Sequence, residues 1–183
     1  MAIRKIANMG HPVLRQIAEA VPENKIKTPE FQQFLRDMAE TMFEYDGRGL
    51  AAPQIHESVQ VLVMLWDFED GKDPGLRYLI NPVIQPLTEE TSSFWEGCLS
   101  VPGLRGFVER PNKISVKALN QKGEKLDFTA VGFAATVIQH ECDHLIGKLY
   151  VDHIKDTTKF AFNKEFGLYH AKAGEETDQG GTD

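Results

Sequence analysis

In the C-terminal third of the chain stands the segment Thr136-Val137-Ile138-Gln139-His140-Glu141-Cys142-Asp143-His144-Leu145-Ile146-Gly147-Lys148. It contains the pattern HExxH, and on an α-helix residues four apart lie above one another on the same face. His140 and His144 are therefore expected to present two imidazole nitrogens to one metal ion, with Glu141 beside them as a base for a water molecule. Apolar neighbours predict that this helix is buried, and Gly147 predicts where it ends.

The same pattern has a plainer interpretation. HExxH also arises by chance in soluble helices, and a single buried histidine is usually a core residue. A buried helix that carries two histidines and a glutamate nevertheless needs partners for them, because unpaired polar groups in a core cost roughly 1–3 kcal/mol each. The metal-site hypothesis therefore depends on a third ligand from elsewhere in the chain.

Composition limits the class of protein. The chain has 183 residues, 42% of them hydrophobic, which predicts one globular domain over residues 1–170. The net charge of −7 and the lack of a dense Lys/Arg cluster argue against nucleic-acid specificity. Two cysteines are too few for a disulfide framework and fit a reducing compartment. No apolar run reaches the ~18 residues of a membrane span, so we expect a cytoplasmic protein without a membrane partner.

Hydrophobic periodicity predicts an α+β fold. Thr28-Pro29 should cap an amphipathic helix that continues through Phe43, because apolar residues recur there at three- and four-residue steps. Asp156 or Thr157 should cap a C-terminal helix containing Phe160, Phe162 and Phe166. Strands are expected at 59–66, 78–83 and 91–94, with a loop at 70–75, a hairpin from 112–119 and 126–130, and a disordered tail at 171–183. The predicted architecture is antiparallel strands packed around a central buried helix carrying HExxH, with a C-terminal helix.

The spacing of residues in the sequence leaves three possible positions for the third ligand to consider. A metzincin-like continuation of the pattern would need a histidine at position 150, which is Tyr150, and His153 is three residues too late. A thermolysin-like arrangement would use a downstream glutamate, for which Glu165 is at a suitable distance. Upstream, Cys98 follows a glycine and would supply a thiolate, a strong ligand for zinc or Fe(II). The ordinary alternative for Cys98 is a small buried core residue.

Three separated motifs resemble those of the peptide deformylases. In this family GxGLAAPQ, EGCLS and HExDH follow one another in that order. Residues 47–54 match the first motif, 96–100 the second and 139–145 the third, and the resemblance extends to His11-Pro12-Val13-Leu14-Arg15. It therefore covers nearly the whole chain except the tail.

The resemblance implies a metal-dependent hydrolase that removes the N-formyl group from the initiator methionine of new polypeptides and releases formate. It implies Cys98, His140 and His144 as ligands of one divalent ion, Fe(II) natively, with zinc, nickel or cobalt as substitutes. Glu141 would transfer the proton. Gln54 and the backbone N–H of Leu99 would stabilise the oxyanion, each donor lowering the activation free energy by roughly 3–4 kcal/mol.

The same motifs and their neighbours also indicate which residues would contact the substrate. A peptide would lie along the backbone at Gly49, which has no side chain in the way. Phe133 and Val137, with Phe94 as a weaker candidate, would hold the methionine side chain, although ordinary core packing explains them equally. The family has a substrate-facing arginine at the position of Arg105. The partners would be N-formyl-methionyl nascent peptides near the ribosome exit.

Two positions depart from the family. Arg48 replaces a residue that is small and aliphatic in many relatives, and it would place a charge at the mouth of the site. Cys142, inside the HExxH, should point away from the metal into the core. The alternative function is an HExxH zinc metallopeptidase with Glu165 as the third ligand. A protein that merely holds metal is a further alternative, against which the base Glu141 argues.

Overall fold

Two antiparallel sheets form the framework of the computed structural model, which describes residues 2–66 and 75–171. The five-stranded sheet has the order β1-β2-β3-β6-β7, and the three-stranded sheet has the order β4-β5-β8. The strands of the first sheet are β1 (Gly49–Ala51), β2 (Val61–Trp66), β3 (Gly75–Pro86), β6 (Lys113–Leu119) and β7 (Lys125–Val131). Those of the second are β4 (Thr91–Cys98), β5 (Val101–Pro111) and β8 (Phe160–Phe162).

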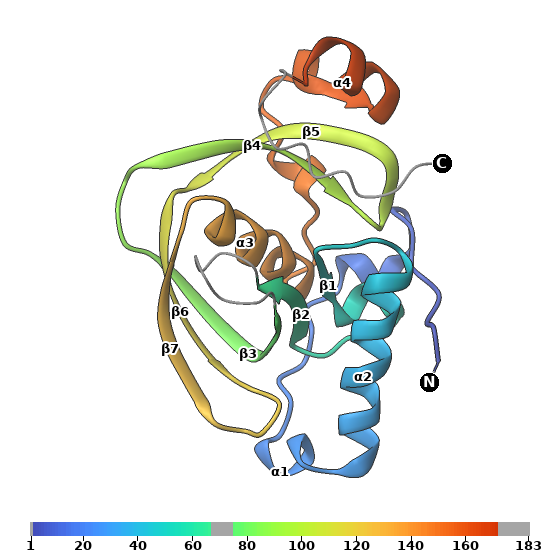
Figure 1. Cartoon of the computed structure of the whole chain (residues 1–183), viewed down its shortest axis with the longest axis vertical. Coiled ribbons are helices and arrows are strands. Elements are labelled where there is room, and N and C mark those ends of the chain that lie inside the picture. Colours follow the sequence, from blue (N-terminus) through green and yellow to red (C-terminus); the bar gives the residue numbers. More distant parts are fainter. Residues whose placement is uncertain (1, 67–74, 172–183) are drawn as a thin grey trace.

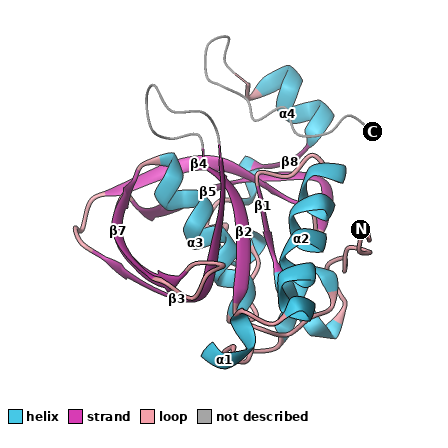
Figure 2. Ribbon diagram, turned by 60° about the horizontal axis from the view of Figure 1, so that its bottom comes forward, coloured by secondary structure: helices cyan, strands magenta, loops and turns pink. Residues whose placement is uncertain are grey.

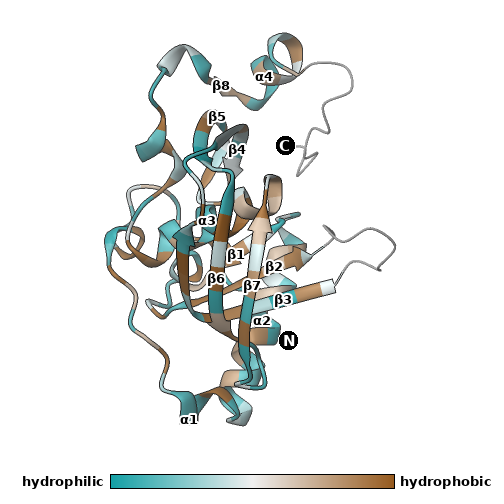
Figure 3. Ribbon diagram, turned by 90° about the vertical axis from the view of Figure 1, so that its left-hand side faces the viewer, coloured by the Kyte–Doolittle hydropathy of each residue, from teal (hydrophilic) through white to brown (hydrophobic). Residues whose placement is uncertain are grey.

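The five-stranded sheet is buried on both faces where it passes through the core. Side chains alternate across a strand, so Leu62 and Met64 of β2 face one hydrophobic cluster while Val61 and Val63 face another. This two-sided burial explains the continuous apolar run of β2. Figure 3 shows hydrophobic and hydrophilic residues alternating along β6 and β7, as expected for strands with one solvent-facing side.

In the part of the chain that the structure describes, four α-helices complete the fold: α1 (Glu23–Ile26), α2 (Pro29–Glu44), α3 (Phe133–Leu145) and α4 (Asn163–Tyr169). The Thr28 hydroxyl accepts a hydrogen bond from the Phe31 backbone N–H at 3.3 Å, which confirms the predicted cap of α2. The apolar face of α2 packs against the outer face of β1 and β2, where it contacts the cluster that contains Leu50, Val61 and Val63. None of the helices within the described residues is long and apolar enough to span a membrane.

Helix α3 carries HExxH and is buried along most of its length. Its apolar residues Ala135, Ile138 and Leu145 pack with the inner face of the five-stranded sheet. Figures 1 and 2 show α3 inside the curve of the strands. Gly147 follows the helix with φ +73°, and a Cβ there would lie 2.8 Å from the carbonyl carbon of Arg15. The prediction that a glycine ends this helix is therefore confirmed, since only glycine fits both constraints.

The α+β class, the antiparallel strands and the hairpin β6–β7 leading into α3 are confirmed. The boundary of the last helix was predicted wrongly. Asp156 caps only a short 3₁₀ turn at Thr157–Lys159, Phe160 and Phe162 belong to β8, and α4 begins at Asn163. Phe160 and Phe162 alternate with Ala161, a pattern that suits a strand, and this strand pairs with β5. The pairing was not predicted, because β5 itself was not predicted from the sequence.

Two other predictions fall outside the described residues. The loop at 70–75 lies there except for Gly75, which begins β3, and the tail at 171–183 lies there except for residue 171. The single domain over residues 1–170 remains a prediction. The 3₁₀ turn at Pro12–Arg15 corresponds to the short helix or arm expected near the N-terminus.

Candidate active site

Three side chains of the types that bind metal ions meet where the end of β4 lies next to α3. Cys98 is the last residue of β4, and His140 and His144 lie one turn apart on α3. One ligand atom from each of the three lies within 4.8 Å of those from the other two. Within residues 2–66 and 75–171, this is the one group of three or more such side chains that the structure brings together.

The donor set fits a transition-metal ion. The Sγ of Cys98 lies 3.4 Å from Nε2 of His144. A sulfur and a nitrogen bound to the same tetrahedral ion, at about 2.3 and 2.0 Å from it, would be about 3.5 Å apart. A thiolate with two imidazoles is also a set suited to zinc or iron rather than to calcium or magnesium. Glu165, the alternative third ligand, is not part of this group.

A buried ion-pair network orients His140. Its Nδ1 lies 2.7 Å from Oε2 of Glu96, so the other ring nitrogen, Nε2, is left for the metal site. Arg110 donates to Glu96 from Nε at 2.6 Å and from Nη2 at 3.0 Å, and also to Asp143 at 2.8 Å. Burial alone would raise the pKa of Glu96, but the hydrogen bonds from His140 and Arg110 outweigh it and hold that pKa at about 2.

Sequence reasoning assigned no role to this network. Glu96 lies inside the quoted EGCLS motif, and a buried glutamate two residues before a ligand was the available signal. Arg110 carried no local signal, because its partners are 14 and 33 residues away along the chain. Asp143 also lies 2.9 Å from Nε2 of His153, so the network extends from the ligand to the partly exposed surface.

Glu141 follows His140 on α3 and is buried next to the ligand set. The residue is 5% exposed, and its Oε2 has no hydrogen-bond partner among the described residues. Burial raises the pKa of its carboxyl to about 7. A Cβ at position 49 would overlap Oε1 of Glu141 and lie 2.8 Å from its carboxyl carbon. The carboxylate can therefore occupy this position only because residue 49 is a glycine.

Gln54 reaches the same place from the opposite wall. Its Nε2 donates to Oγ of Ser100 at 3.2 Å and approaches Sγ of Cys98 at 3.4 Å, while its Oε1 accepts from the Ala51 backbone at 2.8 Å. Three contacts therefore fix the amide next to the ligand set. Ser100, which is fully buried, is a second supporting residue to which the sequence interpretation gave no role.

Leu99 and Tyr150 complete the surroundings of the ligands. Leu99 follows Cys98 in the two-residue turn that joins β4 to β5, and it lines the pocket. Tyr150 stacks on His140 with ring centroids 5.9 Å apart and donates from its hydroxyl to the Leu104 carbonyl at 3.1 Å. The residue that replaces a metzincin ligand in sequence thus packs on a histidine of the ligand set. Burial raises the pKa of the Cys142 thiol, which lies in the core as expected.

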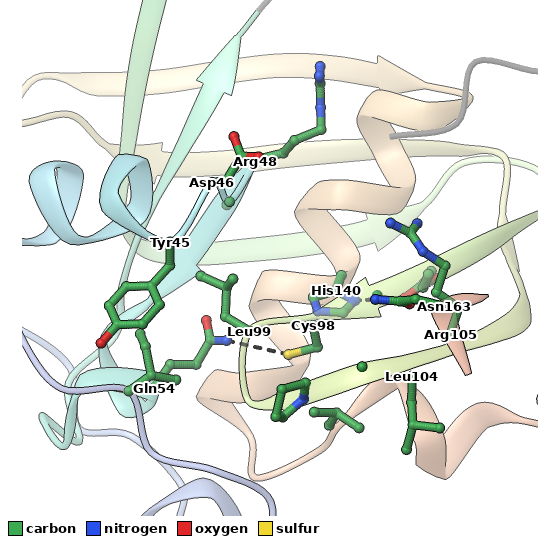
Figure 4. Close-up of a pocket in the computed structure, with 18 of the residues that line it drawn as sticks. Tyr45, Asp46, Arg48, Gln54, Cys98, Leu99, Leu104, Arg105, His140 and Asn163 are labelled. Atoms are coloured by element: carbon green, nitrogen blue, oxygen red, sulfur yellow. Dashed lines mark hydrogen bonds and ion pairs between the residues drawn. The ribbon is translucent and has the colours of Figure 1, made fainter. Parts of the chain in front are cut away.

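A pocket of about 1270 Å³ opens over the ligand set. Figure 4 shows Tyr45, Asp46 and Arg48 on one side of it and Leu104, Arg105 and Asn163 on the other. Most of the predicted site residues line this one pocket: Arg48, Gly49, Gln54, Cys98, Leu99, Arg105, Phe133, Val137, His140 and Glu141.

Two predicted residues do not line the pocket. His144, although it belongs to the ligand set, is fully buried. Phe94 contacts Phe133, with ring centroids 5.3 Å apart, and its part in substrate binding remains a prediction. Sequence reasoning missed several lining residues that come from other elements: Tyr45, Asp46, Trp95, Phe162, Asn163 and Lys164. These come from the end of α2, from β4 and from the C-terminal segment, whose approach to the pocket depends on tertiary packing.

The edge of the five-stranded sheet forms one wall of the pocket. β1 is an edge strand, and the Arg48 carbonyl accepts from the Leu65 N–H of β2 at 2.8 Å. Backbone groups alternate in an antiparallel pair, so those of Gly49 point away from β2. An extended peptide could therefore pair with β1 at Gly49.

Comparison with known proteins finds a family model and sequence relatives that match most of the chain. The family model described as polypeptide deformylase matches residues 3–160. A peptide deformylase of Leptospira biflexa is 46% identical over 170 residues, covering 90% of this chain and 95% of its own. A peptide deformylase of Fusobacterium nucleatum is 49% identical over 157 residues, covering 86% of this chain and 87% of its own.

Solved structures of peptide deformylases also match this chain. The peptide deformylase of Thermotoga maritima matches with a TM-score of 0.75 and 39% identity, covering 85% of this chain and all of its own. A class I type b peptide deformylase of Acinetobacter baumannii, with Met-Ala-Ser bound, matches with a TM-score of 0.77 and 35% identity. That match covers 84% of this chain and 99% of the other.

Proposed function

Because this chain belongs to the polypeptide deformylase family, we propose that it hydrolyses the formamide bond of N-formyl-methionyl peptides and releases formate. The observation that carries the proposal is the meeting of three distant motifs in one pocket. Gln54 of the first motif contacts Cys98 of the second, and Cys98 contacts His144 of the third. A thiolate-and-imidazole set beside a buried carboxylate suits a metal-dependent hydrolase, the class to which the family belongs.

Cys98, His140 and His144 would hold one divalent ion, which supplies Lewis acidity toward a carbonyl oxygen and lowers the pKa of a water molecule. Three protein ligands leave one position of a tetrahedral ion open, as in catalytic rather than structural sites. We propose Fe(II) as the native ion, following the family resemblance, with zinc, nickel or cobalt as substitutes in purified protein. The hydrogen bond from His140 to Glu96 supports this role, because it directs the other imidazole nitrogen to the site.

Glu141 would act as the proton carrier. It accepts a proton from the water whose oxygen attacks the formyl carbon, and delivers it to the amine nitrogen as the C–N bond breaks. The products are formate and a peptide with a free amino terminus. Glu141 lines the pocket, and one of its carboxylate oxygens has no hydrogen-bond partner among the described residues, which supports this role.

Gln54 and Leu99 would stabilise the oxyanion. The Gln54 amide is held at the ligand set by its contacts to Ser100 and Ala51, so it needs little reorganisation when charge develops. The backbone N–H of Leu99 would be the second donor. If Leu99 acts only through its backbone, Leu99→Met should retain its rate, and a large loss would contradict this role.

The substrate would enter as an added strand along β1, with its backbone at Gly49. Phe133 and Val137, on the first turns of α3, would contact the methionine side chain, and Phe94 would support Phe133 from behind. Arg105 and Arg48 would face the chain on opposite sides of the mouth (Figure 4). The guanidinium carbon of Arg48 lies 5.9 Å from the Phe133 ring centroid, which places its charge above the proposed methionine pocket.

We infer that the natural substrates are nascent chains near the ribosome exit and that the enzyme acts in the cytoplasm, without nucleic-acid specificity or a membrane partner. Formyl-methionine begins newly made polypeptides, and the net charge of −7 does not favour nucleic acid.

The test is formate release from formyl-Met-Ala-Ser by anaerobically prepared, metal-loaded protein. We expect turnover in the wild type, and the proposal fails if loaded protein releases no formate. The metal content of two variants distinguishes the deformylase from the metallopeptidase alternative. Cys98→Ser should lose the metal and Glu165→Gln should retain it, whereas the opposite result would favour the peptidase.

A further inference from the structure

The C-terminal segment forms a wall of the pocket that the three motifs do not include. The family model ends at Phe160, yet Phe162, Asn163 and Lys164 line the same pocket as the ligand set. Figure 4 shows Asn163 on the side of Arg105, opposite Tyr45 and Asp46, with its side chain directed toward the pocket. The pocket therefore has a wall built from β8 and the first turn of α4, here called the C-terminal wall.

This wall is held in place by specific contacts. β8 pairs antiparallel with β5, with Phe162 opposite Leu104 and Phe160 opposite Gly106. Phe166 of α4 is 8% exposed, and its ring packs 4.9 Å from that of Trp95. Because Trp95 belongs to β4, three residues before Cys98, the position of α4 is tied to the strand that carries a proposed metal ligand.

The two walls at the mouth differ in charge. Two acidic residues and one basic residue at and after the end of α2 line one side, Glu44, Asp46 and Arg48, whereas two basic residues, Arg105 and Lys164, line the other. A peptide that extends from the buried ligand set must pass between these walls. A carboxylate on the peptide would be attracted toward Lys164 and repelled from Glu44 and Asp46.

We propose that the C-terminal wall contacts the residues that follow formyl-methionine, and that Lys164 makes the enzyme prefer an acidic side chain there. Asn163 supplies a hydrogen bond to the same part of the chain. This inference rests on the proposed function, because it assumes that the pocket binds a formylated peptide. An exposed ion pair of this kind should change kcat/KM by about 1.4- to 5-fold.

The first experiment compares matched peptides at low ionic strength. These are formyl-Met-Glu-Ala against formyl-Met-Lys-Ala, and formyl-Met-Ala-Glu against formyl-Met-Ala-Lys. The wild type should favour the glutamate peptide at one position or both by about 1.4- to 5-fold in kcat/KM. Lys164→Glu should erase or invert that preference, and added salt should weaken it in the wild type.

The matched control is Lys159→Glu. Lys159 belongs to the same C-terminal segment, and its Nζ lies 4.5 Å from the Phe107 ring centroid, but it does not line the pocket. The two variants change net charge equally, so a general field effect would appear in both. The inference is overturned if Lys164→Glu keeps the wild-type preference at both positions, or if Lys159→Glu changes it as much.

A second readout depends on substrate length. Asn163→Ala should raise KM for the tripeptides by about two- to tenfold, the effect of losing one hydrogen bond, while kcat stays close to the wild-type value. KM for formyl-methionine amide, which is too short to reach the wall, should not change. An equal rise in KM for both substrates would contradict the inference. Wild-type protein that releases no formate from formyl-Met-Ala-Ser would refute the proposed function itself, and the inference with it.

Discussion

Gly49→Ala should impair catalysis without removing the metal. The added Cβ would overlap Oε1 of Glu141 and lie 2.8 Å from its carboxyl carbon and 2.9 Å from its Cγ. Ordinary carbon–carbon contacts are about 3.5–4.0 Å, so the carboxylate must move by about 1 Å or β1 must shift. Glu141 has little room for this, because the residue is 5% exposed and lies against the ligand set.

A displacement of about 1 Å at a reacting group can reduce the rate about 100-fold. We therefore expect kcat on formyl-Met-Ala-Ser to fall by roughly two orders of magnitude in Gly49→Ala. The assay measures kcat and KM by formate release, metal content by elemental analysis, and folding by thermal melting. Metal content should stay near one ion per chain, because the overlap involves Glu141 rather than Cys98, His140 or His144.

Gly75→Ala is the matched control. Gly75 lies at the start of β3, and a Cβ there would meet no atom of residues 2–66 and 75–171 within 4 Å. It adds the same methyl group with a similar effect on the unfolded chain, and its activity should match the wild type. The reasoning is refuted if Gly49→Ala retains wild-type kcat with full metal occupancy. A loss of metal in Gly49→Ala would show that the overlap is relieved through the ligands instead.

Three further outcomes are expected. Glu141→Gln should keep its metal and lose about 10²- to 10⁴-fold in kcat, because the amide cannot carry the proton; comparable turnover in formate-release assays would remove Glu141 from the mechanism. Chelation should lower the melting temperature of the wild type by about 8–16 °C, the equivalent of about 4 kcal/mol for an ion supplied at 1,000 times its Kd, and should hardly affect Cys98→Ser. Calorimetry in which both proteins respond equally would argue against Cys98 as a ligand. Arg110→Met should destabilise the fold by about 3–5 kcal/mol in urea unfolding, because it leaves the buried Glu96 and the half-buried Asp143 without the guanidinium that binds both. A loss below about 1 kcal/mol would show that the network contributes little to stability.

Much of the fold followed from local patterns. The period of α2, its Thr28 cap and the glycine after α3 are consequences of a few neighbouring residues, so sequence sufficed for them. The same holds for the hairpin β6–β7, where alternation and a turn act over short range. The start of α4 could not be predicted in this way, because Phe160 and Phe162 form a strand only by pairing with β5, more than 50 residues earlier.

The candidate site also has features that local sequence predicts and features that depend on the tertiary structure. HExxH on a helix determined by itself that two imidazoles and a carboxylate would lie on neighbouring turns, since helical geometry is local. The three motifs together indicated the family and hence Cys98, Gln54 and Leu99 as candidates. No local pattern could decide between Cys98 and Glu165 as the third ligand. In the structure Cys98 lies 3.4 Å from His144, and Glu165 is outside the ligand group.

The sequence by itself thus determined the α+β class, the helix that carries the candidate ligands, and the candidate chemistry. Only the tertiary structure decided which distant residues support and surround that chemistry. Arg110 neutralises Glu96 behind His140, Gly49 leaves space for Glu141, and Lys164 reaches the mouth of the pocket from the far end of the chain. The physical reason is that helical period, capping and turns act between near neighbours. Charge pairing, close approach and the shape of a pocket depend on which segments the fold brings together.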